Sequence, residues 1–215
     1  NTLSNGALDA ATLTTFLTAT TGKVVTVYDK VGTNHVTQGT DGNRPSVTAN
    51  AIGTSYGMTF VRGSNTILTS GSSITQIQPY SLVGIARQVD ATSDQGIMGI
   101  DDGGFNGALI SYTTAPNFRL YSGLSFDQSE TTNTMHAVQG VFAGISSVNR
   151  VDSSETTGNA GVQALVAYNI SIGASGPGSQ FSSHIIMENG YFAGTISSGD
   201  RASLNTNMHA AYGSW

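Results

Sequence analysis

Carboxylate side chains are the first place to look for chemistry in this chain of 215 residues. Enzymes that cleave glycosidic bonds use two carboxyl groups roughly 5–10 Å apart, one of which is kept protonated. Only three glutamates are present: Glu130 and Glu155 lie in polar stretches rich in Ser and Thr, and Glu188 precedes a predicted turn at Asn189-Gly190. The pattern assigns no catalytic residue, and we expect a protein that is not an enzyme.

A pair of adjacent aspartates, Asp101 and Asp102, is followed by Gly103, Gly104 and Asn106. Neighbouring carboxylates repel each other, and a hard cation such as Ca²⁺ would relieve that repulsion. The alternative is a solvated turn that uses Asp and Gly for its backbone geometry. The ligand spacing of an EF-hand is absent, so we assign no metal site and expect no cofactor, and Ca²⁺ at this turn stays open as the alternative.

The same turn contributes to a candidate carbohydrate site. Sugars are held by aromatic ring faces and by hydrogen bonds from amides and carboxylates, and Tyr112 and Tyr121 fall on neighbouring predicted strands close to the turn. The candidate residues are therefore Asp101, Asp102, Asn106, Tyr112 and Tyr121. The alternative is that both tyrosines pack in the core with their hydroxyl groups at its rim.

Other catalytic patterns are absent from the sequence. The four histidines, His35, His136, His184 and His209, are far apart and show none of the short spacings typical of metal ligands. No Gly-x-Ser-x-Gly nucleophile motif occurs, and the Gly-rich pieces lack the Lys of a phosphate-binding loop.

Composition narrows the range of partners. The net charge is -5 and the eight Lys and Arg residues are scattered, whereas nucleic acid binding needs clustered cations. No apolar window approaches the ~20 residues of a membrane span. The chain has no Cys, which excludes disulfides but not an extracellular location, because a core of this size does not need them.

The elements that must position these residues are mostly strands. Apolar and polar residues alternate, as where Phe118 and Leu120 flank Arg119, and turn residues recur about every 8–12 residues, which predicts an all-β sandwich of two antiparallel sheets. Short helices are predicted at residues 9–17 and 201–212, and residues 1–215 form a single domain. Strands are predicted at residues 24–28, 56–62, 66–69, 81–89, 95–101, 107–113, 117–121, 134–146, 148–152, 161–172, 181–188 and 191–197.

Three short motifs carry a resemblance to a known family. Residues 28–45 resemble the Tyr-Asp-Gln-Ser-Gly-Asn-Gly…Thr-Gln…Pro signature of laminin-G-like, concanavalin A-like jelly-roll domains, and residues 60–65 and 191–196 resemble two later elements of that family. The resemblance implies a concanavalin A-like jelly-roll sandwich. We interpret its Asp29 as a turn residue that accepts backbone N–H groups. The positions that match the first signature are Tyr28, Asp29, Gly32, Asn34, Thr37, Gln38 and Pro45.

Function is less closely bounded, because this fold hosts lectins, glycosidases, adhesins and virion proteins. The missing carboxylate pair and the Thr-, Ser-, Gly- and Asn-rich composition favour a non-enzymatic structural or adhesive protein, namely a virion component of a tailed bacteriophage: a capsid decoration or a tail or fibre protein. Its partners would be other virion subunits or cell-surface glycans, its location the virion or the extracellular space, and a homo-oligomer would suit this role. The alternative is a secreted bacterial carbohydrate-binding module or a glycoside hydrolase domain of the arabinofuranosidase type. A third interpretation is a cell-surface adhesin module.

Overall fold

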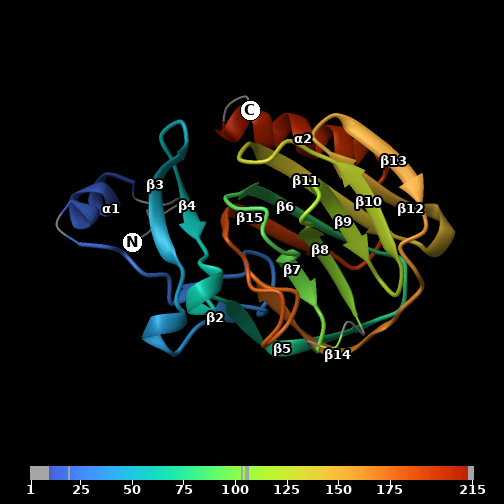
Figure 1. Ribbon diagram of the computed structural model, residues 1–215, viewed down its shortest axis with the longest axis horizontal. Coiled ribbons are helices and arrows are strands. Elements are labelled where there is room, and N and C mark those ends of the chain that lie inside the picture. The colour runs from blue at the N-terminus through green and yellow to red at the C-terminus, as the bar shows by residue number, and fades with distance from the viewer. Residues whose placement is uncertain (1–9, 19, 103, 105–106, 213–215) are drawn as a thin grey trace.

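Two antiparallel β-sheets dominate the computed structural model, which describes residues 10–18, 20–102, 104 and 107–212 (Figure 1). In spatial order, the eight-stranded sheet contains β1 (Thr26–Val27), β2 (Val36–Thr37), β5 (Leu68–Gln76), β14 (Leu165–Ile172), β7 (Gln95–Ile100), β8 (Ala108–Tyr112), β9 (Asn117–Tyr121) and β10 (Ser125–Ser129). The seven-stranded sheet contains β13 (Ser154–Gly158), β12 (Ser147–Val151), β11 (Met135–Phe142), β6 (Tyr80–Gln88), β15 (His184–Phe192), β4 (Ser55–Thr59) and β3 (Ser46–Ile52). The predicted all-β sandwich, with a short helix near each end, is confirmed.

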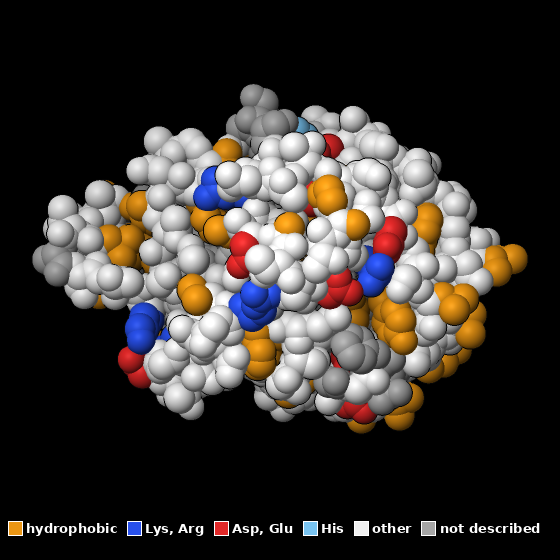
Figure 2. All heavy atoms as spheres, in the orientation of Figure 1, with side chains coloured by type: hydrophobic (Ala, Val, Ile, Leu, Met, Phe, Trp, Pro, Cys, Tyr) orange, Lys and Arg blue, Asp and Glu red, His pale blue; other side chains and the backbone are white. Residues whose placement is uncertain are grey.

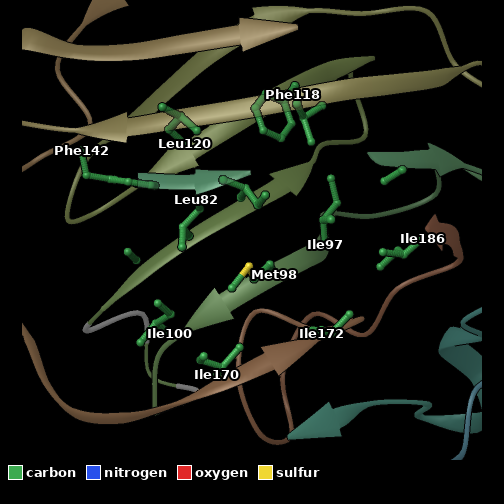
Figure 3. Close-up of a cluster of buried hydrophobic side chains, with 14 of the residues drawn as sticks. Leu82, Ile97, Met98, Ile100, Phe118, Leu120, Phe142, Ile170, Ile172 and Ile186 are labelled. Carbon is green, nitrogen blue, oxygen red and sulfur yellow. The ribbon is translucent and has the colours of Figure 1, made fainter. Parts of the chain in front are cut away.

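Apolar side chains fill the space between the two sheets (Figure 3). Leu82 of β6 faces this core from one sheet, and Ile110 of β8 with Phe118 and Leu120 of β9 face it from the other; all four are 0% exposed. Full burial of one such side chain contributes about 1.5–3 kcal/mol. Since side chains alternate along a strand, the residues between these positions lie on the outer faces of the sheets.

Helix α2 (Ser198–Tyr212) covers the outer face of the seven-stranded sheet. Its Leu204 and Met208 pack in a second apolar cluster with Val83 and Ile85 of β6. The helix begins where the Ser197 hydroxyl accepts a hydrogen bond from a backbone N–H of the first turn, which is the usual role of an N-cap. Because one outer face is covered in this way, the outer face of the eight-stranded sheet is the broad surface left for a site.

Helix α1 (Ala10–Leu17) lies beside β3 and β4 at the end of the molecule opposite β13 (Figure 1). It contacts the β3–β4 hairpin through a hydrogen bond between the hydroxyl groups of Thr14 and Tyr56. The predicted helix began at Asp9, which lies outside the described residues. Within the described part of the chain, no helix is both long and apolar enough to cross a membrane.

Several sequence predictions about the strands were incomplete or wrong. The strands β2, β3, β10 and β13 were not predicted: β2 has only two residues, and β3, β10 and β13 lie at sheet edges, where one apolar face is not required. The separate strand predicted at residues 191–197 was wrong, because β15 continues to Phe192 and ends there. The predicted turn at Asn189-Gly190 was wrong: β15 runs straight through it, with Asn189 opposite Gly84 and Gly190 opposite Val83 of β6. Pairing with a central strand overrides the local turn preference of an Asn-Gly pair.

Candidate functional site

The outer face of the eight-stranded sheet carries a pocket of about 430 Å³ over β8, β9 and β10. Since Phe118 and Leu120 point into the core, Arg119 and Tyr121 point out of it. The cross-strand register sets Ser111 of β8 beside Arg119. We call this pocket the outer groove, and it is lined by Gly104, Leu109, Ser111, Arg119, Tyr121, Ser125 and Gln180.

Arg119 is the centre of an ion-pair network at the edge of the outer groove. Its Nε and Nη2 each donate to an oxygen of Asp127 at 2.7 Å, and its Nη1 donates to Oδ2 of Asp94 at 3.0 Å. The hydrogen bonds to Asp127 raise the pKa of Arg119, which therefore stays charged. All three side chains are a quarter to a third exposed, and Figure 2 shows acidic and basic side chains side by side on this face. The network holds two solvent-accessible carboxylates on opposite edges of one guanidinium.

One wall of the outer groove is the segment 173–183, which folds back over β7 and which we call the wall loop. Its neck is closed by a hydrogen bond from the Ser182 N–H to the Gly173 carbonyl, at 2.9 Å. The N–H of Gly96 donates to the carbonyl of Gln180, also at 2.9 Å. The loop can lie this close only because Gly96 and Gly99 have no side chain: an added Cβ would come within 2.2 Å of the Ser175 nitrogen and 1.6 Å of its carbonyl oxygen, respectively. The Gly- and Ser-rich sequence of residues 173–179 is typical of a turn-rich loop, but it does not indicate that the loop lies on a sheet face.

The structure separates the five residues of the predicted carbohydrate site. Tyr121 lines the outer groove. Tyr112 is fully buried between Phe118 and the ring of His184, so it cannot contact a sugar in the groove. Ser111, which pairs with Arg119, faces the groove. Tyr112 is the next residue along β8, so its side chain points to the opposite face of the sheet, into the core.

The two aspartates of the acidic turn before β8 differ in exposure, and the buried one, Asp101, has a structural role. Asp101 is 1% exposed, and its Oδ2 accepts a hydrogen bond from the N–H of Gly107 at 2.8 Å. Asp102 is exposed, and its Oδ1 accepts one from Gly104, which lines the outer groove. Asn106 lies outside the described residues. Within the described ranges, no three Asp, Glu, His or Cys side chains gather closely enough to hold a metal ion.

The three glutamates lie elsewhere in the molecule. Glu188 accepts a hydrogen bond from the Tyr212 hydroxyl at 3.0 Å on the α2 side, and burial together with Glu188 raises the pKa of Tyr212 to about 12. Glu155 is bound to Arg201 at 2.6 Å, and this contact lowers its pKa. Glu130 belongs to a separate polar cluster. The carboxylates beside the groove are therefore aspartates, which the search for paired glutamates missed.

That separate cluster surrounds His136. Its Nδ1 lies 2.7 Å from Oδ2 of Asp152, and its Nε2 lies 2.8 Å from the Thr131 carbonyl and 3.2 Å from Oε2 of Glu130. Burial disfavours the charged ring, but these acceptors outweigh it and raise the pKa of His136 to about 10. By contrast, burial lowers the pKa of His184 to about 3. One histidine is thus a cation locked between acids and the other a neutral core residue.

Asp29 accepts hydrogen bonds from the N–H groups of Val31, at 2.9 Å, and Asn34, at 3.2 Å. The bond from Val31 is the largest contribution to a lowered pKa of Asp29. The geometry fits the interpretation of Asp29 as a turn residue, and it lies on the β1–β2 connection, away from the groove-lining residues.

The chain matches no protein-family model and no curated protein sequence. Its fold is shared with solved β-sandwich glycoside hydrolases. An arabinofuranosidase complexed with arabinofuranosyl-α-1,2-xylobiose is similar with a TM-score of 0.75 and 19% identity, over 98% of this chain and 56% of that chain. A GH54 α-L-arabinofuranosidase soaked with 4-nitrophenyl α-L-arabinofuranoside gives 0.72 and 18%, with the same coverage. Trypanosoma rangeli sialidase in complex with the inhibitor DANA gives 0.52 and 15%, over 86% of this chain and 31% of that chain. The present chain spans about half the length of the arabinofuranosidases, and at these identities the likeness establishes the fold.

These comparisons correct two expectations drawn from the sequence. The expected non-enzymatic virion component of a tailed bacteriophage was wrong, because the similar structures are glycoside hydrolases and favour the carbohydrate-active alternative. The expectation that the chain is not an enzyme is contradicted by the same structures. Both expectations rested on a polar composition, which many secreted proteins share, and on the absence of a paired-glutamate pattern.

Proposed function

We propose that this chain is a carbohydrate-active domain with a glycoside hydrolase fold, and that its sugar site is the outer groove. The observation that carries the proposal is the lining of that groove: an aromatic ring from Tyr121, hydroxyl groups from Ser111 and Ser125, and the charged network of Arg119. Its volume of about 430 Å³ lies within the range of small-molecule pockets. A jelly-roll resemblance in sequence and arabinofuranosidase-like coordinates both support this class.

The charge of the site favours a neutral sugar. Arg119 carries one positive charge, whereas Asp94 and Asp127 carry two negative charges against it. Asp102, at the Gly104 side of the groove, adds a third. A ligand carboxylate would meet a local excess of negative charge, and like charges at an interface oppose binding. Neutral furanosides or pyranosides therefore fit the groove better than uronic or sialic acids.

Hydrolysis is the second part of the proposal, and we assign its carboxylate, which acts as nucleophile or general base, to Asp94 or Asp127, both of which are ion-paired with Arg119. Glycosidic cleavage needs one carboxyl group to protonate the leaving oxygen and another to attack the sugar or activate water. Of the described carboxylates, these two share a guanidinium beside the groove. Arg119 would hold their spacing fixed while the sugar lies over Tyr121.

Contact with cell-surface glycans, an extracellular location and a homo-oligomer remain predictions from the sequence, as does membership of the concanavalin A-like lectin and glucanase family.

The test is turnover of 4-nitrophenyl α-L-arabinofuranoside and a panel of other neutral aryl glycosides by the purified chain. We expect either Asp94→Asn or Asp127→Asn to lower the rate at least 100-fold, which is the low end for removal of a base catalyst. Asp41→Asn is the matched control, because Asp41 also binds an arginine, Arg44 at 3.0 Å, but not in the groove. Equal rates in all variants would refute the assignment. Saturable sugar binding without turnover would support the site and reject its hydrolytic role.

A further inference from the structure

Gln180 stands out among the residues that line the outer groove. It has a positive φ of 45°, a conformation uncommon for a residue other than Gly. Its Oε1 is shielded from solvent and accepts no hydrogen bond in the described part of the chain. A shielded polar oxygen without a partner is destabilising, and residues held in strained conformations concentrate at functional sites. Both features occur at one residue of the groove wall.

The backbone of Gln180 is fixed by its surroundings. Its own carbonyl accepts the Gly96 N–H of β7 at 2.9 Å. The next turn of the wall loop is closed by Ser182, whose hydroxyl also bonds the buried ring of His184. The loop cannot relax the strain by shifting along the sheet, since β7 anchors it through a main-chain hydrogen bond. The side-chain amide offers an acceptor on one side and two donors on the other, and its acceptor is the group without a hydrogen-bond partner.

We propose that Gln180 is the specificity-determining residue of the outer groove, and that its amide recognises a sugar hydroxyl. The inference rests on the proposed function and names what the site selects: a neutral sugar with a free hydroxyl group facing the wall loop. A hydroxyl both donates and accepts, so it satisfies the amide in either orientation of its carbonyl and amino groups. Binding would supply the partner that Oε1 lacks in the free protein. An analogue without that hydroxyl would leave the amide unpaired and be rejected.

The chain offers a matched control for this role. Gln163 also has a shielded Oε1 without a hydrogen-bond partner. It lines a different pocket, of about 290 Å³, where Leu124, Val162 and Gly161 are among its neighbours. If an unpaired amide oxygen alone produced an effect on sugar binding, both glutamines would show it. Only Gln180 should, because only Gln180 lines the outer groove.

The experiment measures dissociation constants by titration calorimetry for methyl α-L-arabinofuranoside, methyl β-D-galactopyranoside and the monodeoxy analogues of each. We expect the wild-type chain to bind one monodeoxy analogue at least tenfold more weakly than its parent sugar, which corresponds to about 1.4 kcal/mol. Gln180→Met should bind both equally, and Gln163→Met should keep the wild-type preference. Gln180→Gly removes the amide and the backbone strain together, so it should behave as Gln180→Met does even if the Met variant folds poorly.

Two failures are distinguishable. Sugar binding that Tyr121→Ala abolishes, but whose hydroxyl preference survives in Gln180→Gly, would overturn the role of Gln180 and leave the groove assignment standing. If none of the neutral sugars binds the wild-type chain, or if Tyr121→Ala leaves their binding unchanged, the groove assignment and the role of Gln180 fail together.

Discussion

Gly99 of β7 is the position at which the wall loop can be tested most directly. A Cβ added there would lie 1.6 Å from the carbonyl oxygen of Ser175 and 2.4 Å from its carbonyl carbon. Both atoms belong to the backbone, so no change of side-chain rotamer can relieve the overlap. In Gly99→Ala either β7 or the wall loop must move, and the loop, which is packed on the sheet from outside, has the freedom to do so.

The expected size of the effect follows from the geometry. Adding a methylene-sized group to a well-packed site costs about 1–3 kcal/mol, and the two backbone contacts place Gly99→Ala near the upper end. For a domain of this length each kcal/mol lowers the melting temperature by about 2–4 °C, so a loss of roughly 6–12 °C is expected. Movement of the loop would also displace Gln180, and sugar affinity should fall with stability.

The matched control is Gly71→Ala. Gly71 is also a strand glycine of the eight-stranded sheet, in β5, but an added Cβ there meets nothing within 4 Å. We expect its free energy of unfolding to change by no more than about 0.5 kcal/mol. Denaturant unfolding followed by circular dichroism measures both variants against the wild-type chain. If Gly99→Ala and Gly71→Ala unfold at the same midpoint, the wall loop is not packed against β7 and the outer groove lacks its wall.

Two further predictions concern buried charges. The pKa of His136 rises from 6.5 to about 10 in the folded chain, so its contribution to stability is complete below about pH 6.5 and is lost as the pH rises through 10. In urea titrations from pH 6 to pH 10.5, His136→Gln should remove this decline and cost about 3 kcal/mol at pH 7, since it leaves Asp152 and Glu130 without their cation. Arg201→Met should cost about 2–3 kcal/mol, because Arg201 anchors α2 to Glu155 by two bonds of 2.6 and 2.9 Å.

A control variant tests the Arg201 prediction, and the pH dependence of the wild-type chain tests the His136 prediction. Lys23→Met removes an exposed ion pair with Asp41, for which we expect a much smaller loss of stability than for Arg201→Met, because solvent screens exposed charges. A loss as large as that of Arg201→Met would show that the burial of Arg201 is not what gives its pair its strength. For the histidine, a wild-type chain whose stability stays level between pH 7 and pH 10.5 would contradict the picture of a cation held between two acids.

The elements that the sequence predicts best are those with one solvent-exposed face and one buried face. Along β9, Phe118 and Leu120 enter the core while Arg119 and Tyr121 leave it, as the alternation indicates. Leu204 of α2 likewise packs in the apolar cluster beneath the helix, four residues before Met208 on the same helix face. In both elements the burial of one face determines the structure, and the spacing of apolar residues in the sequence shows which face is buried.

The candidate site was harder to predict, because its residues come from separate stretches of the chain. Asp94 precedes β7, Asp127 lies on β10, and they meet only because Arg119 stands between them in the sheet. Nothing in local spacing brings the first two together. Tyr112 shows the opposite error: its aromatic ring suggested a sugar platform, but its phase along β8 puts it inside the core, where burial raises the pKa of its hydroxyl well above the ordinary value.

The sequence analysis missed both the strand β10 and its residue Asp127, and the two omissions are related. β10 reads Ser-Phe-Asp-Gln-Ser, and its only apolar residue is the partly buried Phe126. As an edge strand it needs little apolar surface, and its outward face is free to carry Asp127 opposite Arg119. The weak apolar alternation of β10 therefore follows from its edge position, as it does at β13, whereas β9 pairs on both sides and keeps a strong alternation while its Arg119 and Tyr121 face the groove.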